Sequence, residues 1–370
     1  MVPTSDFLGL DDITHLAAGG QSPVLLSTLP ALDRAARAKG TGLAGQRLNE
    51  AVRARVASKV AALIGAEPGD IGFPSSVAHG VSLVADAVDW RSGDNVVMER
   101  WEFPSLMNPF LAQARHGVEV RTVAPTGFHA PLSRFAQAID ARTRVVAVSH
   151  VSYLTGERHD LEAYAALARK AGALFVVDAS HALGSVRVDA AIADVLVGCC
   201  YKFLFGVHGV AIASWNRRRL PDWRPRLTGW HSTEWRPPFD EPRELHVKST
   251  GQAFEPGNPA YPALHVLDAS LDYLAALGME HVEAHTLAMS GALRRRLAAL
   301  GVSVMTPEPA AARAGSVSFE HADPMAVREA LEAARVLVTG ELGRVRASVH
   351  VYTDHDDLDA LATALEDAIG

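Results

Sequence analysis

Short runs of β-branched and other apolar residues recur through the middle of the chain and alternate with segments of helical spacing. Strands that are apolar over nearly their whole length, separated by helices, indicate a mostly parallel sheet covered on both faces. A helix is predicted where apolar residues recur at three-to-four spacing, as from Leu48 to Gly65. The predicted strands are residues 95–100, 118–124, 144–151, 173–180, 194–200 and 209–215, and the other predicted helices here are 105–115, 131–140 and 160–171.

The alternation of strand and helix patterns stops between residues 216 and 260, where Pro, Trp and Arg are frequent. This composition predicts a long loop that leads into a helix over 260–277. Helix and strand patterns then return on a smaller scale, and "VRASVHVY" is the last predicted strand. We therefore expect an α/β fold with a large domain, whose mostly parallel sheet is flanked by helices, and a smaller C-terminal α+β domain. The predicted boundaries are an irregular N-terminal arm at 1–30, the large domain at 31–255 and the small domain at 256–370.

Composition and charge limit the kinds of molecule that the protein is expected to bind. The chain of 370 residues has a net charge of -7 and no dense basic block, so neither nucleic acid nor an anionic membrane is an expected partner. Without a signal sequence or a long apolar segment, a cytoplasmic protein is predicted. The two cysteines, Cys199 and Cys200, are neighbours, and the 16 histidines form no HExxH pattern, so no disulfide framework and no metal site is predicted.

Two ionisable residues follow consecutive predicted strands. Asp178 ends the run "ALFVVDAS", and Lys202 comes just after "DVLVGCC". Taken alone, Asp178 would be a helix cap and Lys202 a surface residue. Because parallel strands end at the same edge of a sheet, however, both side chains are expected in one crevice. A lysine that holds an aldehyde as a Schiff base, and an acid that keeps a pyridine nitrogen protonated, suit pyridoxal 5'-phosphate (PLP).

A phosphate group needs its own binding site. Ser75 and Ser76 directly precede an apolar helical run, where free backbone N–H groups and the helix dipole favour an anion, although Ser76 is also an ordinary N-cap. Trp101 or Phe103 is placed to cover a cofactor ring or to pack in the core. The chain has no GxGxxG and no GxxxxGK[ST] motif, so a nicotinamide-dependent oxidoreductase lacks its usual evidence.

The segments "HVSYLTGERHD", "FVVDASHALGSVRVDAAIADVLVGCCYKFLFGVHG", "TGW" and "FEPGNP" resemble the class V aminotransferase family of PLP-dependent enzymes. Within that family the chain is most similar to the kynureninase-like branch. The resemblance extends from about residue 45 to the end of the chain. It implies the PLP-dependent transferase fold type I, an amino-acid substrate and a homodimer.

The resemblance also implies a role for each matching residue. Lys202 would be the Schiff-base lysine, Asp178 the partner of the pyridine nitrogen, and His181 a neighbour of the phenolic oxygen or ring face. Tyr201 would contact phosphate and transfer protons. The remaining implied contacts are Ser76 and Val77 on the phosphate loop, where Val77 replaces the usual Thr, Phe103 at the ring-stacking position, and Trp230 and Asn258 reaching the phosphate across a dimer interface.

Arg346 in "VRASVHVY" matches the arginine that grips the substrate's α-carboxylate with a fork of two hydrogen bonds, and Arg344 on the same strand face is the fallback. After an external aldimine forms, the freed lysine would abstract the α-proton. Aromatic residues of the loop 216–259 are expected to border the pocket or to lie at a dimer contact; they are Trp223, Trp230, His231 and Trp235.

Departures from the family pattern limit the prediction of the reaction. Ser152 replaces an Asn, and "FGVHG" stands where kynureninases carry "NGGPG". No Cys follows Cys200, which excludes the catalytic-cysteine mechanism of desulfurases unless a partner supplies the thiol; Cys199 and Cys200 are expected as small residues beneath the lysine. We expect a kynureninase-like hydrolase or Cβ lyase. The alternatives are an aminotransferase or epimerase of the same family and, third, a non-catalytic scaffold relative.

Overall fold

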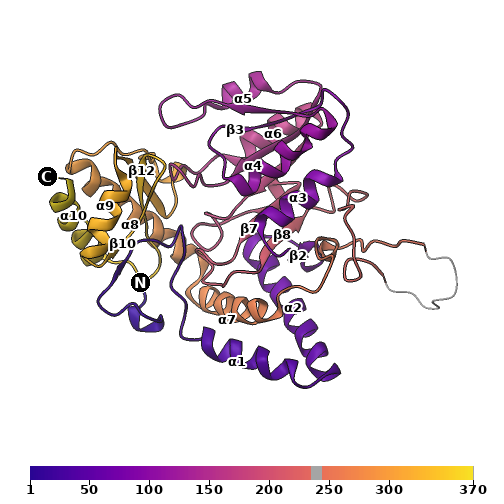
Figure 1. Ribbon diagram of the computed structural model, residues 1–370, viewed down its shortest axis with the longest axis horizontal. Coiled ribbons are helices and arrows are strands. Elements are labelled where there is room, and N and C mark those ends of the chain that lie inside the picture. The colour runs from indigo at the N-terminus through magenta and orange to yellow at the C-terminus, as the bar shows by residue number, and fades with distance from the viewer. Residues whose placement is uncertain (235–243, 370) are drawn as a thin grey trace.

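A seven-stranded sheet forms the centre of the computed structural model, which describes residues 1–234 and 244–369 (Figure 1). One strand runs antiparallel to both of its neighbours, and the other neighbouring pairs are parallel. The mostly parallel sheet and all six predicted strands are confirmed. In spatial order the strands are β2 (Ile71–Gly72), the antiparallel β8 (Ala211–Trp215), β7 (Val195–Cys199), β6 (Leu174–Asp178), β5 (Thr143–Ser149), β3 (Asn95–Glu99) and β4 (Glu119–Val123).

Helices cover both faces of this sheet (Figure 1). Along β5 the side chains alternate, so that Val146 and Val148 pack in one hydrophobic cluster and Val145 and Ala147 in the other. All four are fully buried. The first cluster includes α2 (Leu43–Ile64), α5 (Leu132–Ala138), α6 (Leu161–Ala171) and α7 (Tyr261–Leu277), and the second includes α3 (Val77–Ala87) and α4 (Pro104–Leu111).

Local signals account for both ends of α6. The side chain of Asp160 accepts a hydrogen bond from the backbone N–H of Ala163 and caps α6, which ends at Gly172 with a φ of 68°. By contrast, α1 (Thr28–Lys39) lies where the sequence predicts no helix. It packs against α2 and α7 through small residues, Ala31, Ala35 and Ala38, which make a weak hydrophobic pattern.

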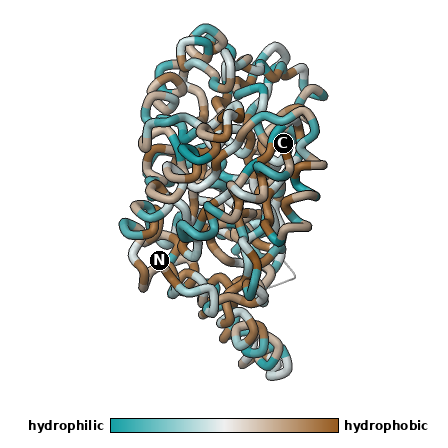
Figure 2. Tube along the Cα trace, turned by 90° about the vertical axis from the view of Figure 1, so that its left-hand side faces the viewer, coloured by the Kyte–Doolittle hydropathy of each residue, from teal (hydrophilic) through white to brown (hydrophobic). Residues whose placement is uncertain are grey.

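A smaller antiparallel sheet lies toward the C-terminus, in the order β11 (Thr339–Glu341), β12 (Arg344–Ser348), β9 (Ser316–Glu320). Its strand β12 is the predicted last strand. Hydrophobic and hydrophilic residues alternate along the helices around it, as expected for elements that bury one face (Figure 2). Those helices are α8 (Met279–Ala299), α9 (Pro324–Ala333) and α10 (His355–Ile369), and β1 (Thr14–His15) pairs with β10 (Val336–Leu337) to attach the N-terminal segment.

The predicted long loop is irregular over 216–234 and 244–250, and the predicted helix after it is α7. Trp235 lies outside the described residues. Within the described part of the chain, every helix is too short or too polar to cross a membrane. The domain boundaries given above remain predictions.

Candidate active site

The carboxyl ends of β6 and β7 form the base of a pocket. The two strands are parallel neighbours, Asp178 is the last residue of β6, and Lys202 follows Cys199, the last residue of β7. The crevice expected at this edge of the sheet is therefore present. Six of the predicted site residues line the pocket, namely Val77, Phe103, Asp178, His181, Tyr201 and Lys202.

Lys202 is almost completely buried, with 8% of its surface exposed. Its Nζ lies 3.1 Å from Nε2 of His181 and 5.5 Å from the centre of the Phe103 ring. Cys199 and Cys200 are buried too, and burial raises the pKa of both thiols. A buried thiol that resists ionisation is a poor nucleophile, which agrees with the expectation that both cysteines are small packing residues.

Asp178 is a buried carboxylate, 4% exposed, whose Oδ1 accepts a hydrogen bond of 2.8 Å from the backbone N–H of Ser180. Burial raises the pKa of Asp178, while hydrogen bonds from Ser180 and the charge of Lys202 act against that rise. Within residues 1–234 and 244–369, no Lys, Arg or His nitrogen lies within 4.0 Å of this carboxylate. A buried acid that lacks a close cation fits a protonated pyridine nitrogen as its partner.

His181 has one ring nitrogen toward Lys202, and its other nitrogen, Nδ1, is buried without a hydrogen-bond partner in the described structure. Burial, and then the charges of Lys202, Arg346 and Arg344, lower the pKa of His181 well below its usual value. The ring is therefore neutral. A buried polar atom without a partner indicates a group that is bound here when the protein works, so the pocket fits PLP.

The predicted phosphate loop has the geometry of a helix N-cap. The Ser76 hydroxyl accepts a hydrogen bond from the backbone N–H of His79 at the start of α3, and the backbone N–H of Ser75 donates to the His79 ring. Ser75 and Ser76 are exposed, and Val77 lines the pocket. The ordinary capping role is thus present, and phosphate binding by Ser76 and Val77 remains a prediction.

Aromatic side chains enclose the pocket above Lys202. The Phe103 ring is 37% exposed and packs edge-on against Tyr153, with 5.0 Å between the ring centres. Tyr201 stacks on His208 at 4.0 Å, and burial is the first cause that raises the pKa of Tyr201 to about 12. Phe103 lines the pocket and is partly exposed, so its ring is available for stacking, while the Tyr201 hydroxyl stays protonated at neutral pH.

Glu102, which was not predicted from the sequence, lies behind the pocket. Its carboxylate accepts hydrogen bonds from both the backbone N–H, at 2.7 Å, and the hydroxyl of Ser149, a residue that lines the pocket and pairs with Asp178 across the sheet. Burial raises the pKa of Glu102 to about 7; the hydrogen bonds from Ser149 oppose this, and the charge of Asp178 adds to it. The available signal was an acidic residue just after a buried strand, the same signal that singled out Asp178.

The predicted substrate arginine is buried beside the pocket. Arg346 is 3% exposed and donates to the backbone carbonyl of Tyr153 at 2.6 Å and to the Thr339 hydroxyl at 3.4 Å, whereas its Nε has no partner in the described structure. Burial, and then the charge of Arg344, lower the pKa of Arg346 to about 9. Tyr153, also missed in the sequence, is therefore the link between the pocket and β12.

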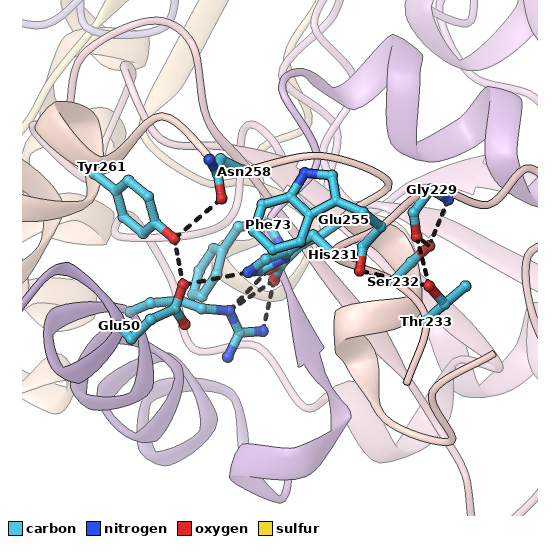
Figure 3. A network of polar contacts seen from close by, with 11 residues as sticks. Glu50, Phe73, Gly229, His231, Ser232, Thr233, Glu255, Asn258 and Tyr261 are labelled. Atoms are coloured by element: carbon cyan, nitrogen blue, oxygen red, sulfur yellow. Dashed lines mark hydrogen bonds and ion pairs between the residues drawn. The ribbon is translucent and has the colours of Figure 1, made fainter. Parts of the chain in front are cut away.

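Asn258 belongs to a second polar cluster, which includes His231 (Figure 3), and Trp230 packs edge-on against His231 with 5.3 Å between the ring centres; neither Trp230 nor Asn258 lines the pocket. Both are exposed, and the Asn258 side chain points toward the hydroxyl of Tyr261. His231 lies between two carboxylates, 3.1 Å from Glu255 and 3.3 Å from Glu50, and hydrogen bonds to these two carboxylates raise the pKa of His231 to about 9. Of the described aromatic residues of the loop, Trp223, Trp230 and His231, none lines the Lys202 pocket, and Trp223 packs instead against Trp215 and Phe254.

Among residues 1–234 and 244–369, no cluster of three or more His, Cys, Asp or Glu side chains could hold a metal ion. The chemistry available in the pocket is therefore that of a buried amine, a buried carboxylate, a neutral imidazole and an aromatic ring.

Comparisons with known proteins agree with this chemistry. Residues 33–361 match the family Aminotransferase class-V. A kynureninase of Pseudomonas fluorescens is 32% identical over 296 residues, which cover 75% of this chain and 68% of that protein. A probable cysteine desulfurase of Methanothermobacter thermautotrophicus is 27% identical over 334 residues, covering 84% of this chain and 82% of that protein.

Solved structures share the fold. The complex of the cystine C–S lyase C-DES with its product cysteine persulfide has a TM-score of 0.89 at 24% identity and covers 98% of this chain and 99% of its own. A C-DES variant with glycine covalently linked to its PLP cofactor has a TM-score of 0.91, also at 24% identity, with coverage of 99% and 100%. The apo cysteine desulfurase of Thermococcus onnurineus has a TM-score of 0.88 at 22% identity, with coverage of 99% and 97%. These likenesses establish fold type I.

Proposed function

Because the chain belongs to the class V aminotransferase family of PLP-dependent enzymes, we propose that it cleaves a bond at Cβ of an amino-acid substrate, as a hydrolase or a lyase. The observation that carries the proposal is the buried Nζ of Lys202, 3.1 Å from a neutral His181 and at the same sheet edge as the buried Asp178. The enzyme class and the cofactor follow from the family. The reaction and the residue roles are our proposal.

Each pocket residue is proposed to bind a different part of the cofactor. Lys202 would hold PLP through its aldehyde, Asp178 would pair with the ring nitrogen, and Phe103 would stack on the ring. His181 lies beside Lys202 and supplies the unpartnered Nδ1. Bound PLP supplies an electron sink that stabilises negative charge at the substrate's α-carbon. Ser76, Val77 and Tyr201 are proposed for the phosphate, with Trp230 and Asn258 contributed by a second copy of the chain.

Lys202 is also the proposed base for the α-proton. A free lysine amine accepts a proton, and the neutral imidazole of His181 at 3.1 Å accepts a hydrogen bond from the ammonium that results. Because burial keeps His181 uncharged, it does not repel that ammonium. Arg346 orients the substrate by binding its α-carboxylate through the unpartnered Nε and the neighbouring N–H groups.

Cleavage at Cβ is favoured over cysteine desulfuration through a protein thiol. Both cysteines of the chain are buried and their thiols resist ionisation. Two relatives described above, a kynureninase and a cystine C–S lyase, are named for reactions on amino acids. Transamination and epimerisation share the α-proton step and differ in where the proton returns. We further propose that the protein works in the cytoplasm as a homodimer.

The test is a product assay with the PLP-loaded protein and a panel of kynurenine, alanine, cysteine, serine and other amino acids. Release of alanine, or of pyruvate from a substrate other than alanine, that is absent in Lys202→Ala supports Cβ cleavage. A keto acid that retains the substrate side chain, formed together with aminated cofactor, contradicts cleavage and establishes transamination. Inversion at the α-carbon without bond cleavage establishes epimerisation.

A further inference from the structure

A second buried arginine on β12, Arg344, has no role in the proposed function. Its side chain is 0% exposed, and none of its three guanidinium nitrogens has a hydrogen-bond partner among the described residues. Glu341 is its one ion-pair partner in the described part of the chain, at 3.7 Å, and the Glu341 side chain is 54% exposed. Removing a guanidinium from water without replacing its hydrogen bonds is costly, so a ligand that restores them is expected.

Arg344 and Arg346 both contact Tyr153, which lines the Lys202 pocket, although neither arginine lines that pocket itself. The guanidinium carbon of Arg344 is 5.5 Å from the centre of the Tyr153 ring, and the Tyr153 carbonyl accepts a hydrogen bond from Arg346. Burial and then three positive charges, two of them those of Arg346 and Arg344, lower the pKa of His181 in the pocket wall. Both guanidinium groups are therefore within electrostatic reach of the reacting centre.

The register of β12 sets the spacing of the two arginines. Val345 and Ala347 point into the core of the smaller sheet, so Arg344 and Arg346 share its opposite face. Alternate residues of a strand lie roughly 6.6 Å apart along its axis. The two side chains therefore leave the strand on one face at neighbouring positions, as two anionic groups of one short ligand would require.

We propose that Arg344 binds an anionic group at the end of the substrate's side chain, and that the substrate is a short amino acid whose side chain ends in a carboxylate or a sulfinate. The inference rests on the proposed function, in which Arg346 binds the α-carboxylate. Guanidinium forks match both anions with two hydrogen bonds each. A neutral side chain, such as that of kynurenine, leaves Arg344 buried and unpaired, which disfavours its binding.

The test compares matched pairs of ligands. The dissociation constants of L-aspartate and L-asparagine, and of L-cysteine sulfinate and L-cysteine, are measured by absorbance titration of the PLP-loaded protein. At least ten-fold tighter binding of one acidic member supports the proposal, and the pair that shows it distinguishes a carboxylate from a sulfinate. Arg344→Gln should abolish that preference. Arg335→Gln is the control of equal charge change, because Arg335 is exposed and donates to the Asp12 backbone carbonyl; it should retain the preference.

A second measurement needs neither cofactor nor variant. Calorimetry of succinate and butyrate with the wild-type apo protein should show at least ten-fold tighter binding of the dianion, and this decides the question if Arg344→Gln does not fold. Equal binding within every pair, or tighter binding of kynurenine than of the acidic amino acids, overturns the proposal while the proposed function stands. If no amino acid changes the spectrum at all, the proposed function itself fails.

Discussion

At the scale of single residues, burial sets the protonation states in the pocket more than ion pairing does. Burial is the first cause that raises the pKa of Asp178 and Glu102 and lowers that of His181. Lys202 lies in the same pocket with His181 neutral at 3.1 Å. The polar groups of the pocket are therefore available to bind a charged ligand. Removing one of these groups is expected to affect function more than folding.

Asp178→Asn keeps the shape of the side chain but removes its charge. We expect kcat/KM with the amino acid found in the product assay to fall by about 100-fold or more, because the ring nitrogen loses its anionic partner. PLP affinity should fall as well. Asp160→Asn is the control, since Asn caps a helix as well as Asp does, and it should leave both values unchanged. Unchanged kcat/KM in Asp178→Asn contradicts the assigned role.

Glu102 predicts a pH dependence of stability. The folded protein raises the pKa of Glu102 from 4.5 to about 7, so its contribution to stability is complete below pH 4.5 and is lost as pH rises through 7. Compared with Glu102→Gln, the wild type should lose about 2 to 3 kcal/mol of unfolding free energy between pH 5 and pH 8. Urea unfolding of the apo proteins at several pH values measures the difference. The exposed Glu366→Gln should show no such trend, and a constant gap for Glu102→Gln refutes the prediction.

At the scale of elements, the segments that follow β6 and β7 pack closely against each other at Gly184. This residue has a φ of 81°, and a Cβ there would collide with the backbone carbonyl of Phe203, the residue after Lys202. Gly184→Ala should therefore destabilise the protein by more than the 1 to 2 kcal/mol that positive φ alone costs, and should weaken PLP binding. Gly172→Ala, at a φ of 68° with nothing within 4 Å, should show only the backbone cost. Equal effects in thermal melts would mean that the two segments adjust freely.

Elements with strong periodicity were predictable from the sequence, and so were the residues at strand ends. Local hydrophobic pattern predicts the Val-rich strands. Sequence motifs at the strand ends identify Lys202, Asp178 and His181. Arg344 and Tyr153 come together only through contacts between distant parts of the chain, which no local pattern records. The helix α1 was missed because its buried face consists of Ala, whose small side chains give a weak hydrophobic signal.

At the scale of the whole molecule, Trp230 and Asn258 are exposed and lie outside the Lys202 pocket, which favours a site completed by a second copy of the chain. Subunit mixing tests this. Lys202→Ala and Asn258→Ala proteins are each expected to be weakly active or inactive. A 1:1 mixture allowed to exchange subunits should regain about a quarter of wild-type activity, because half of the dimers are mixed and each has one intact site. If no activity returns although native mass spectrometry shows subunit exchange, Asn258 does not complete the active site of the other chain. It then contributes to the site of its own chain or to no site.

The central claim is that Lys202 carries the cofactor, and borohydride reduction of the PLP-loaded protein followed by peptide mass spectrometry tests it most directly. We expect a pyridoxyl phosphate adduct on Lys202, the loss of the visible cofactor band on reduction, and neither signal in Lys202→Ala. An adduct on another lysine, such as Lys248, or a band that survives in Lys202→Ala, would contradict it.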